Sequence, residues 1–330
     1  EVIPERKDLS VPAGYDHSEV SDSVNRRFWY GGKGMKAVDE LWNRRNKAEL
    51  DVGSWSHAYA RLIPPAMFKD HPEYFAIKRG ERRPGQLCTS NPDVIRVAAE
   101  ALLRTMKEKP GLTVYPAGPN DGGGLCECAE CARLDTPGYL EPSSGKPSAA
   151  DRVFAFASEL AARTSKAYPE KDLGILIYSE YSRPLLKLTN LHANVFPMFA
   201  PIRRCRFHGP NHPGCHWGEL WGREIRDWSA FSRKMGFYIY NYNLGDALLP
   251  LGKLTFYKDT MKAAHESGAG QTAWIFESID AWASHAPHLY LSVRLSWNSR
   301  LDIDAEMDRY FKGFYGAAAV LMRDYWMRID

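Results

Sequence analysis

Residues 112–121 read LTVYPAGPND, an apolar run that ends in two polar residues, Asn120 and Asp121. Five further apolar or β-branched runs are predicted strands: 55–63, 173–179, 194–200, 236–242 and 272–278. Amphipathic segments typical of helices occupy 91–109, 148–169 and 253–268. Strands that alternate with helices in this way predict an α/β fold with a parallel sheet.

Polar and aromatic side chains stand at the ends of several predicted strands, at Asn120-Asp121, Glu180-Tyr181, Asn241-Tyr242 and Glu277. In a (β/α)8 TIM-like barrel the carboxyl ends of the strands carry the chemistry, so we predict that fold. The alternative is a doubly wound sheet with a phosphate-binding glycine loop. The glycines at 31–34 and 122–124 have neither the G-x-G-x-x-G spacing of dinucleotide-binding loops nor the spacing of a P-loop. The sequence therefore argues against nucleotide binding.

The 330 residues suit one catalytic barrel domain over 1–330. Because the chain begins with Glu1 and 317–330 reads as a helix without a cap, we expect a fragment of a longer secreted or periplasmic protein. The 43 basic and 40 acidic residues include no basic block, which argues against nucleic acid as a partner. No 18-residue apolar run predicts a membrane span, and the oligomeric state is left open.

Two carboxylates at strand ends point to hydrolysis of a glycosidic bond. One such group protonates the leaving oxygen, and a second stabilises or attacks the anomeric carbon. Asp121 and Glu277 are the predicted catalytic pair, and the apolar neighbours Ile275 and Phe276 would raise the pKa of Glu277 into the range of a general acid. The alternative is that Asp121 opens the glycine turn and that Glu277 caps a neighbouring element.

Further side chains at the same strand ends are candidates for binding sugar hydroxyls or stacking on sugar rings. For the aromatic residues and His57 the alternative is core packing, and for Glu180 it is an ion pair with Arg183. The predicted substrate-binding residues are Asn120, His57, Tyr178, Glu180, Tyr240, Asn241, Tyr242 and Trp274, with Trp282 as a further stacking candidate.

Six cysteines allow three interpretations. Cys128 and Cys131 have the spacing of a zinc knuckle, and Cys205 with Cys215 would complete four thiolate ligands of a structural zinc. Disulfides in a secreted enzyme and free thiols are the alternatives, and Cys88 stands alone. No cofactor is expected to take part in the chemistry.

A catalytic zinc is a further alternative, because His208, His212 and His216 are four residues apart. That spacing binds a metal on a helix, which Pro210 and Pro213 exclude here.

Three stretches carry a family likeness: HPEYFAIKRGERRPGQLCTSNPDV (71–94), PNDGGGLCECAEC (119–131) and LYLSVRLSWNSRLDIDAEMDRYFKGFYG (289–316). They resemble glycoside hydrolase family 163, formerly catalogued as domain of unknown function 4838, over roughly residues 50–320. The resemblance implies a bacterial TIM-barrel enzyme. It also implies an endo-β-N-acetylglucosaminidase that acts on complex N-glycans.

The resemblance also implies roles for single residues. Asn120 and Asp121 match the family's Asn-Asp, and Glu277 matches a glutamate after the last strand, although F-E-S-I stands here where the family often has F-E-Q-G. Related hexosaminidases use an Asp-Glu pair with the substrate's acetamido group as nucleophile, so Asn120-Asp121 leaves the division of roles open. The five family-like cysteines are 126, 128, 131, 205 and 215.

We therefore expect a glycoside hydrolase that cleaves β-linked N-acetylglucosamine in glycans, with Glu277 as general acid/base and Asp121 orienting an acetamido group or stabilising the oxocarbenium ion. The first alternative is a hydrolase of an anionic or marine polysaccharide, for which Arg183, Arg203 or Arg204 in the pocket would speak. The second is a barrel that binds carbohydrate without cleaving it.

Overall fold

The computed structural model describes residues 10, 12–16, 18–30, 43, 45–48, 52–242, 249–278 and 284–330. Within these ranges six strands form one parallel sheet in the order β1-β8-β7-β6-β5-β4. Their bounds are β1 Ser23–Tyr30, β4 Val114–Pro116, β5 Asp172–Ile177, β6 Val195–Phe199, β7 Lys234–Tyr240 and β8 Gln271–Ser278.

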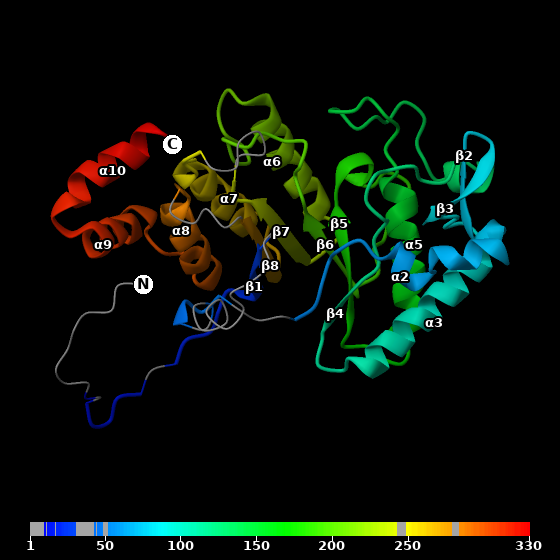
Figure 1. Cartoon of the computed structure of the whole chain (residues 1–330), viewed down its shortest axis with the longest axis horizontal. Helices are drawn as coiled ribbons and strands as arrows, with labels where there is room; N and C mark the ends of the chain where they lie inside the picture. Colours follow the sequence, from blue (N-terminus) through cyan, green and yellow to red (C-terminus); the bar gives the residue numbers. More distant parts are fainter. Residues whose placement is uncertain are drawn as a thin grey trace.

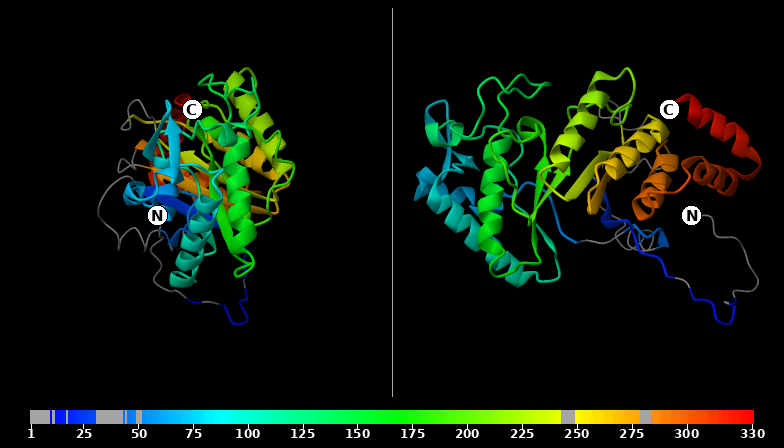
Figure 2. Two further views of the ribbon diagram at one scale, coloured as in Figure 1. Left: turned by 90° about the vertical axis from the view of Figure 1, so that its right-hand side faces the viewer. Right: turned by 180° about the vertical axis from the view of Figure 1, so that it is seen from behind.

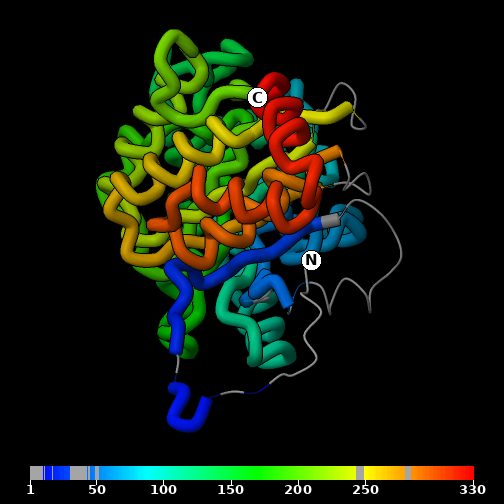
Figure 3. Tube along the Cα trace, turned by 90° about the vertical axis from the view of Figure 1, so that its left-hand side faces the viewer, coloured from blue at the N-terminus to red at the C-terminus, as the bar shows by residue number. Residues whose placement is uncertain are grey.

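Helices lie against this sheet and extend beyond it. In Figure 1, α3 and α5 lie beside β4 and β5 at one end of the molecule, and α8, α9 and α10 form the other end. Figure 3 shows α9 and α10, in orange and red, at that second end. The long helices are α3 Pro92–Glu108, α5 Ala150–Thr164, α6 His216–Ser229, α7 Leu254–Glu266, α8 Ala286–Trp297, α9 Ile303–Tyr315 and α10 Ala319–Arg328. Every helix in the described ranges is too short or too polar to cross a bilayer.

The sheet is curled into half a barrel, and its edge strand β4 gains a further parallel neighbour. Gly53 and His57 form isolated parallel bridges with Val114 and Gly118. The fold is therefore α/β with a parallel sheet, as the alternation predicts. Closure into eight strands stays a prediction, because the described ranges contain six strands in this sheet.

Most of the predicted elements are present. Five of the six predicted strands form β4 to β8, and the three predicted helices are α3, α5 and α7. Asn91 caps α3 as expected, because its side chain accepts a hydrogen bond from the backbone N–H of Asp93. The prediction of a strand over 55–63 is wrong in its second half, where Tyr59–Leu62 forms the short helix α2.

A small hairpin lies outside the main sheet. Strands β2 (Phe75–Lys78) and β3 (Glu81–Leu87) pair antiparallel in a separate two-stranded sheet. Two short 3-10 turns, Pro65–Lys69 and Pro72–Tyr74, lead into it. Figure 2 shows the hairpin, in cyan, at the same end of the molecule as α3. The sequence pattern did not predict it, because Arg82, Arg83, Pro84 and Gly85 interrupt any apolar alternation.

Trp55 packs into the curl of the sheet, over a position on β5 where only glycine fits. Trp55 is buried, its indole N–H donates to the carbonyl of Phe196 at 2.9 Å, and its ring meets the Phe196 ring edge-on at 5.0 Å. On β5, Gly174 lies beneath this segment. A Cβ atom there would stand 2.6 Å from the carbonyl oxygen of Ser54 and 2.9 Å from Cγ of Trp55.

Gly174→Ala should therefore destabilise the protein. Because the nearest atom is backbone and Trp55 is held by a hydrogen bond, we expect the free energy of unfolding to fall by about 1–3 kcal/mol. Urea unfolding followed by tryptophan fluorescence measures this change.

The matched control is Gly111→Ala, where a Cβ meets nothing within 4 Å. It should change the free energy of unfolding by no more than about 1 kcal/mol. Equal stability of the two variants would contradict the close approach of residues 54–55 to β5.

Candidate active site

The site begins with the alternation of side chains along β8. Ile275 and Glu277 point into the curl of the sheet and line a cavity, whereas Trp274 and Phe276 point away from it and are buried. The parallel register places Trp29 of β1 and Tyr240 of β7 opposite Glu277 on the two neighbouring strands. Three adjacent strands therefore present side chains to one concave face.

The cavity on this face has a volume of about 430 Å³. Both predicted catalytic carboxylates, Asp121 and Glu277, line it. Side chains able to stack on a sugar or bind its hydroxyls complete the wall: Arg27, Trp29, His57, Tyr178, Tyr238 and Tyr240. The structure thus brings together residues that lie up to 250 positions apart in the sequence at the carboxyl ends of parallel strands.

Two phenols hold the carboxylate of Glu277. The Tyr238 hydroxyl donates to Oε2 at 2.6 Å, and the Tyr242 hydroxyl donates to Oε1 at 2.5 Å. Burial, and then the hydrogen bond to Glu277, raise the pKa of both tyrosines above the usual value, so both remain protonated donors. The surroundings of this carboxylate are therefore hydroxyls rather than the apolar pair, Ile275 and Phe276, that the sequence indicated.

Asp121 also lines the cavity and is much more open, with 68 % of its side chain exposed. Its Oδ1 accepts from the backbone N–H of Gly122 at 2.9 Å and from the Tyr178 hydroxyl at 3.3 Å. Nε2 of His57 lies 3.8 Å from the same oxygen. Because Nδ1 of His57 meets the Pro119 carbonyl at 2.6 Å, and a carbonyl only accepts, Nδ1 carries a hydrogen.

The neighbouring Asn120 positions Asp121. Its Oδ1 accepts from the backbone N–H of Ala60 at 2.9 Å, and its Nδ2 donates to the carbonyl of Gly85 at 2.8 Å. Its backbone exchanges two hydrogen bonds with the amide of Gln86, at 3.1 and 2.6 Å. Both ends of the Asn120 amide are thus used within the protein, which gives this predicted substrate ligand a positioning role.

Two further cavities adjoin the first through shared residues. One of about 260 Å³ shares Asp121 and Tyr178 with it and is also lined by Lys146, Glu180 and Arg203. The other, of about 410 Å³, shares Asn120 and Asp121 with the second and lies against the β2–β3 hairpin. Asp121 borders all three hollows.

Glu180, Arg183 and Arg204 differ from their expected arrangement. Glu180 pairs with Lys146 instead of Arg183, whose guanidinium lies 4.4 Å from the ring centre of Tyr139. Arg204 is buried between Glu224 and Glu141, at 2.8 and 3.1 Å. Of the three arginines expected to face an anionic sugar, Arg203 alone lines one of the cavities described above.

Two predicted substrate ligands lie on the other face of their strands. Trp274 stacks on Phe237 with ring centres 4.7 Å apart and is 3 % exposed. Asn241 is fully buried, and its Oδ1 accepts from the Tyr257 hydroxyl at 2.6 Å. Trp274 directly precedes the cavity-lining Ile275, and Asn241 directly follows the cavity-lining Tyr240. Because successive side chains of a strand point to opposite faces, both pack toward the helices. Trp282, the further stacking candidate, lies outside the described residues.

Four site residues escaped the sequence argument. Trp29 and Arg27 lie on β1, which was not predicted because 23–30 mixes polar and aromatic residues, and Tyr238 lies in mid-strand. The spacing of Tyr238, Tyr240 and Tyr242 by two was the signal available. Arg206 lies 4.1 Å from the ring centre of Tyr240 and interacts electrostatically with Glu277.

The structure separates the cysteines that were predicted to share one zinc. Cys128 and Cys131 gather with Cys88 and Cys126, with all four sulfur atoms within 4.8 Å of one another. Cys205 and Cys215 form a different group with His208. The four-ligand set Cys128, Cys131, Cys205 and Cys215 is therefore wrong, and all six thiols are free.

Residues 208–215 are not helical, as Pro210 and Pro213 predicted. His212 instead pairs with Asp259 at 2.8 Å and stacks on His208 with ring centres 4.3 Å apart, whereas His216 begins α6. Among the described residues, those lining the cavity of Glu277 include neither Cys205, His208 nor Cys215.

Comparison with protein families finds a match to "Domain of unknown function (DUF4838)" over residues 1–327. The chain belongs to this family. A search of curated proteins finds no match to the DUF4838 chain.

Two solved structures are similar to the DUF4838 chain at low identity. One is a family 89 glycoside hydrolase from Clostridium perfringens in complex with its substrate GlcNAc-α-1,4-galactose, with a TM-score of 0.46 and 14 % identity, covering 79 % of this chain and 26 % of that one. The other is a family 138 enzyme targeting pectin rhamnogalacturonan II, with a TM-score of 0.33 and 13 % identity, covering 91 % and 42 %. The chain thus spans less than half of either protein, and at these scores the likeness transfers no activity.

The positioning role of Asn120 in the DUF4838 chain is testable by a single-atom change. Asn120→Asp replaces the Nδ2 donor with an oxygen that faces the Gly85 carbonyl, so two acceptors meet. We expect the free energy of unfolding to fall by about 1–3 kcal/mol, measured by chemical denaturation at neutral pH.

Asn298→Asp is the control, because Oδ1 of Asn298 accepts from the backbone N–H of Arg300 and a carboxylate oxygen can do the same. We expect a change within about 0.5 kcal/mol. If Asn120→Asp is equally mild, Asn120 does not hold the end of β4.

Proposed function

We propose that this chain is a glycoside hydrolase that cleaves β-linked N-acetylglucosamine in glycans, within the glycosidase family 163 that its motifs resemble. The observation that carries the proposal is that Asp121 and Glu277 line one cavity of about 430 Å³ at the carboxyl ends of parallel strands. Most glycoside hydrolases use two carboxyl groups that flank the scissile bond.

The walls of the cavity support a sugar as its occupant. Trp29 is 48 % exposed although its ring lines the cavity, and its edge meets Tyr238 with ring centres 6.1 Å apart. An indole left open in a hollow offers an apolar face to the C–H face of a sugar ring, while the hydroxyls of Tyr178 and Tyr240 and the ring of His57 offer hydrogen bonds.

Glu277 is assigned the general acid/base role. In the protonated form it would give its hydrogen to the glycosidic oxygen as the C–O bond breaks, and the carboxylate would then take a proton from the attacking water. Tyr238 and Tyr242 fix both of its oxygens, which limits the motion needed during proton transfer.

Asp121 is assigned the stabilising role. Its carboxylate would accept the N–H of an acetamido group or stabilise the positive charge of the oxocarbenium ion. Its exposure and its remaining acceptor capacity suit contact with a substrate.

Three hollows that meet at Asp121 support a substrate of several sugars, as endo action requires. A single sugar would occupy the cavity of Glu277, and a longer chain would continue past Asp121 toward the hairpin. The expected secreted or periplasmic location and the single catalytic barrel domain within a longer protein stay predictions that accompany this substrate.

The test is release of glycan from N-glycoproteins and β-N-acetylglucosaminides, read by mass spectrometry. Glu277→Gln and Asp121→Asn should each lower turnover by about 10²–10⁴-fold, because each removes a proton carrier or a charge at the reacting centre. Glu108→Gln, on the exposed end of α3, is the control and should leave turnover unchanged.

Full turnover in both site variants would contradict these roles. Binding of glycans without release by the wild-type chain would instead favour a barrel that binds carbohydrate without cleaving it.

A second candidate is hydrolysis of an anionic glycan or polysaccharide. Basic side chains gather along the outer hollows: Lys78, Arg79 and Arg83 line the one beside the hairpin, and Lys146 and Arg203 line the middle one. Part of this charge is offset, since Arg83 pairs with Glu81 at 3.0 Å, Arg203 pairs with Glu141 at 3.5 Å, and Lys146 pairs with Glu180. Lys78 and Arg79 are therefore the side chains whose removal tests this candidate.

Lys78→Ala/Arg79→Ala should raise KM for an acidic glycan by about tenfold or more, because a hydrogen bond to a charged group contributes about 1.5–3 kcal/mol. Turnover at saturation and KM for a neutral glycan should stay unchanged, as measured by steady-state kinetics on the two substrates. Arg104→Ala/Lys107→Ala, on the exposed face of α3, removes the same charge elsewhere and is the control. Equal effects on both substrates would speak against an anionic substrate.

A further inference from the structure

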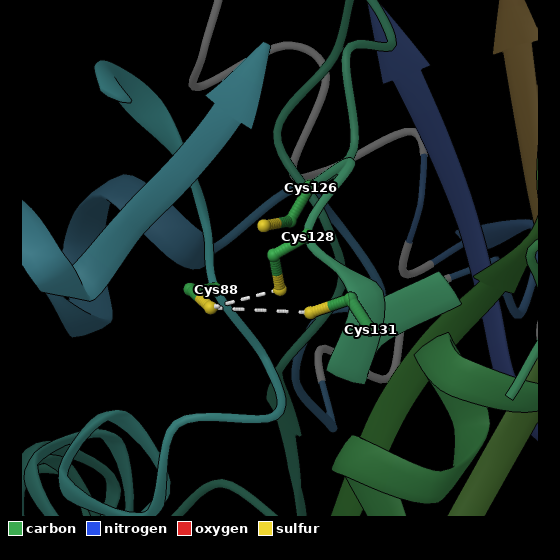
Figure 4. Close-up of side chains that lie close together, drawn as sticks. All are labelled: Cys88, Cys126, Cys128 and Cys131. Atoms are coloured by element: carbon green, nitrogen blue, oxygen red, sulfur yellow. Dashed lines mark hydrogen bonds between the residues drawn. The ribbon is translucent and has the colours of Figure 1, made fainter. Parts of the chain in front are cut away.

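Four cysteine side chains meet between the β2–β3 hairpin and the loop that follows β4. Cys88 stands directly after β3, and Cys126, Cys128 and Cys131 follow the glycine loop. Figure 4 shows the four thiols converging from these two segments. Three of them, Cys88, Cys126 and Cys131, are buried.

The spacing of the sulfur atoms matches a metal site better than a disulfide. Sγ of Cys88 lies 3.7 Å from Sγ of Cys128 and 4.0 Å from Sγ of Cys131. Four thiolates around a zinc ion, with Zn–S bonds of about 2.3 Å, stand about 3.8 Å apart along the edges of a tetrahedron. A disulfide would bring two of the sulfurs to about 2.05 Å.

The surroundings supply donors for thiolate ligands. The backbone N–H of Ile77 donates to Sγ of Cys126 at 3.3 Å, and the Ser90 hydroxyl lies 3.1 Å from Sγ of Cys131. The Arg82 guanidinium interacts with Cys88. Four thiolates and one zinc ion carry a net charge of −2, so a cation and hydrogen-bond donors around the sulfurs stabilise such a centre.

The fastening would act on the outer part of the hairpin. The base of the hairpin is already held, because Phe75 and Leu87 are buried in the main core and Gln86 exchanges two hydrogen bonds with Asn120. The small apolar cluster that joins the hairpin to the loop consists of the four cysteines with Ala76 and Ile77. Beyond this cluster the backbone N–H of Glu127 donates to the carbonyl of Ile77 at 2.8 Å. The contact between the outer hairpin and the cysteine loop therefore buries few apolar groups, and a bound metal ion would add to its stability.

We propose that Cys88, Cys126, Cys128 and Cys131 bind a structural zinc ion that fastens the β2–β3 hairpin to the loop carrying Asp121. This ligand set differs from the one that the spacing of the cysteines predicted, because Cys88 and Cys126 replace Cys205 and Cys215. The zinc takes no part in the hydrolysis. It holds the wall of the hollow that Lys78 and Arg79 share with Asp121.

The first experiment counts metal ions. Because Cys205, His208 and Cys215 form a second thiol group, the reference protein is Cys205→Ser/Cys215→Ser, in which bound zinc belongs to the four-cysteine group. We expect one zinc per chain in this reference by native mass spectrometry and elemental analysis. Adding Cys131→Ser should lower the content to less than a tenth of that value after dialysis against a chelator.

Three measurements keep the proposal testable if the triple variant does not fold. Titration of the metal-free reference with Co²⁺ should give the intense thiolate-to-cobalt charge-transfer band of a tetrahedral sulfur site. Hydrogen exchange should become faster over 75–88 after the metal is removed and stay unchanged in β7 and β8. Peptide mapping without reductant should find the four thiols unlinked.

Three results would overturn the proposal: a disulfide among these cysteines, a reference protein that holds no zinc and no Co²⁺, or iron in place of zinc. The proposed hydrolysis stands apart from each of them, because Glu277→Gln acts on turnover without changing the zinc content.

Discussion

The site depends on the register of β8, which is hydrogen-bonded to β1 on one side and to β7 on the other. A slip of one residue would move Trp274 and Phe276 into the cavity and place the Glu277 carboxylate among the helices. Both exchanges are unfavourable, since a stacked indole would lose its partners and a charge would lose water and its two phenol donors. The packing of Trp274 and Phe276 on the helix side of the sheet therefore determines that the Glu277 carboxylate lies on the cavity side.

The two carboxylates are held by different means. Glu277 lies on β8, which has a hydrogen-bonded strand on each side, and its position follows from that strand and from Tyr238 and Tyr242. Asp121 lies on a loop and is located by the hydrogen bonds of Asn120 and Gln86, together with the fastening of the cysteines. The sheet alone would place one carboxylate, and the second requires the hairpin.

The sequence predicted the parallel strands and the long helices well, because apolar runs and caps such as Asn91 are local signals. It also placed Asp121 and Glu277 at strand ends, and these two do line one cavity. It failed where spatial proximity depends on distant segments. Cys88 belongs with Cys126 only because the hairpin folds back over the loop, and no spacing in the sequence reports that contact. Asn241 and Trp274 were predicted to bind substrate from their position on the predicted strands alone. That prediction did not take into account that successive side chains of a strand point to opposite faces.

The glycine loop between Asn120 and Cys126 joins two anchored points and leaves little freedom for change. Gly122, Gly123 and Gly124 all have positive φ, at 92°, 69° and 76°, so other residues would be strained there. An insertion in this loop would have to fit between the hydrogen-bonded side-chain amide of Asn120 and the thiol of Cys126 in the four-cysteine group. Variation in substrate range is then more readily reached through the tip of the hairpin, at 79–83, where Arg79 and Arg83 border a hollow and which lies outside the contacts of Gly85 and Gln86 with Asn120. Laboratory evolution of new specificity would best begin at that tip.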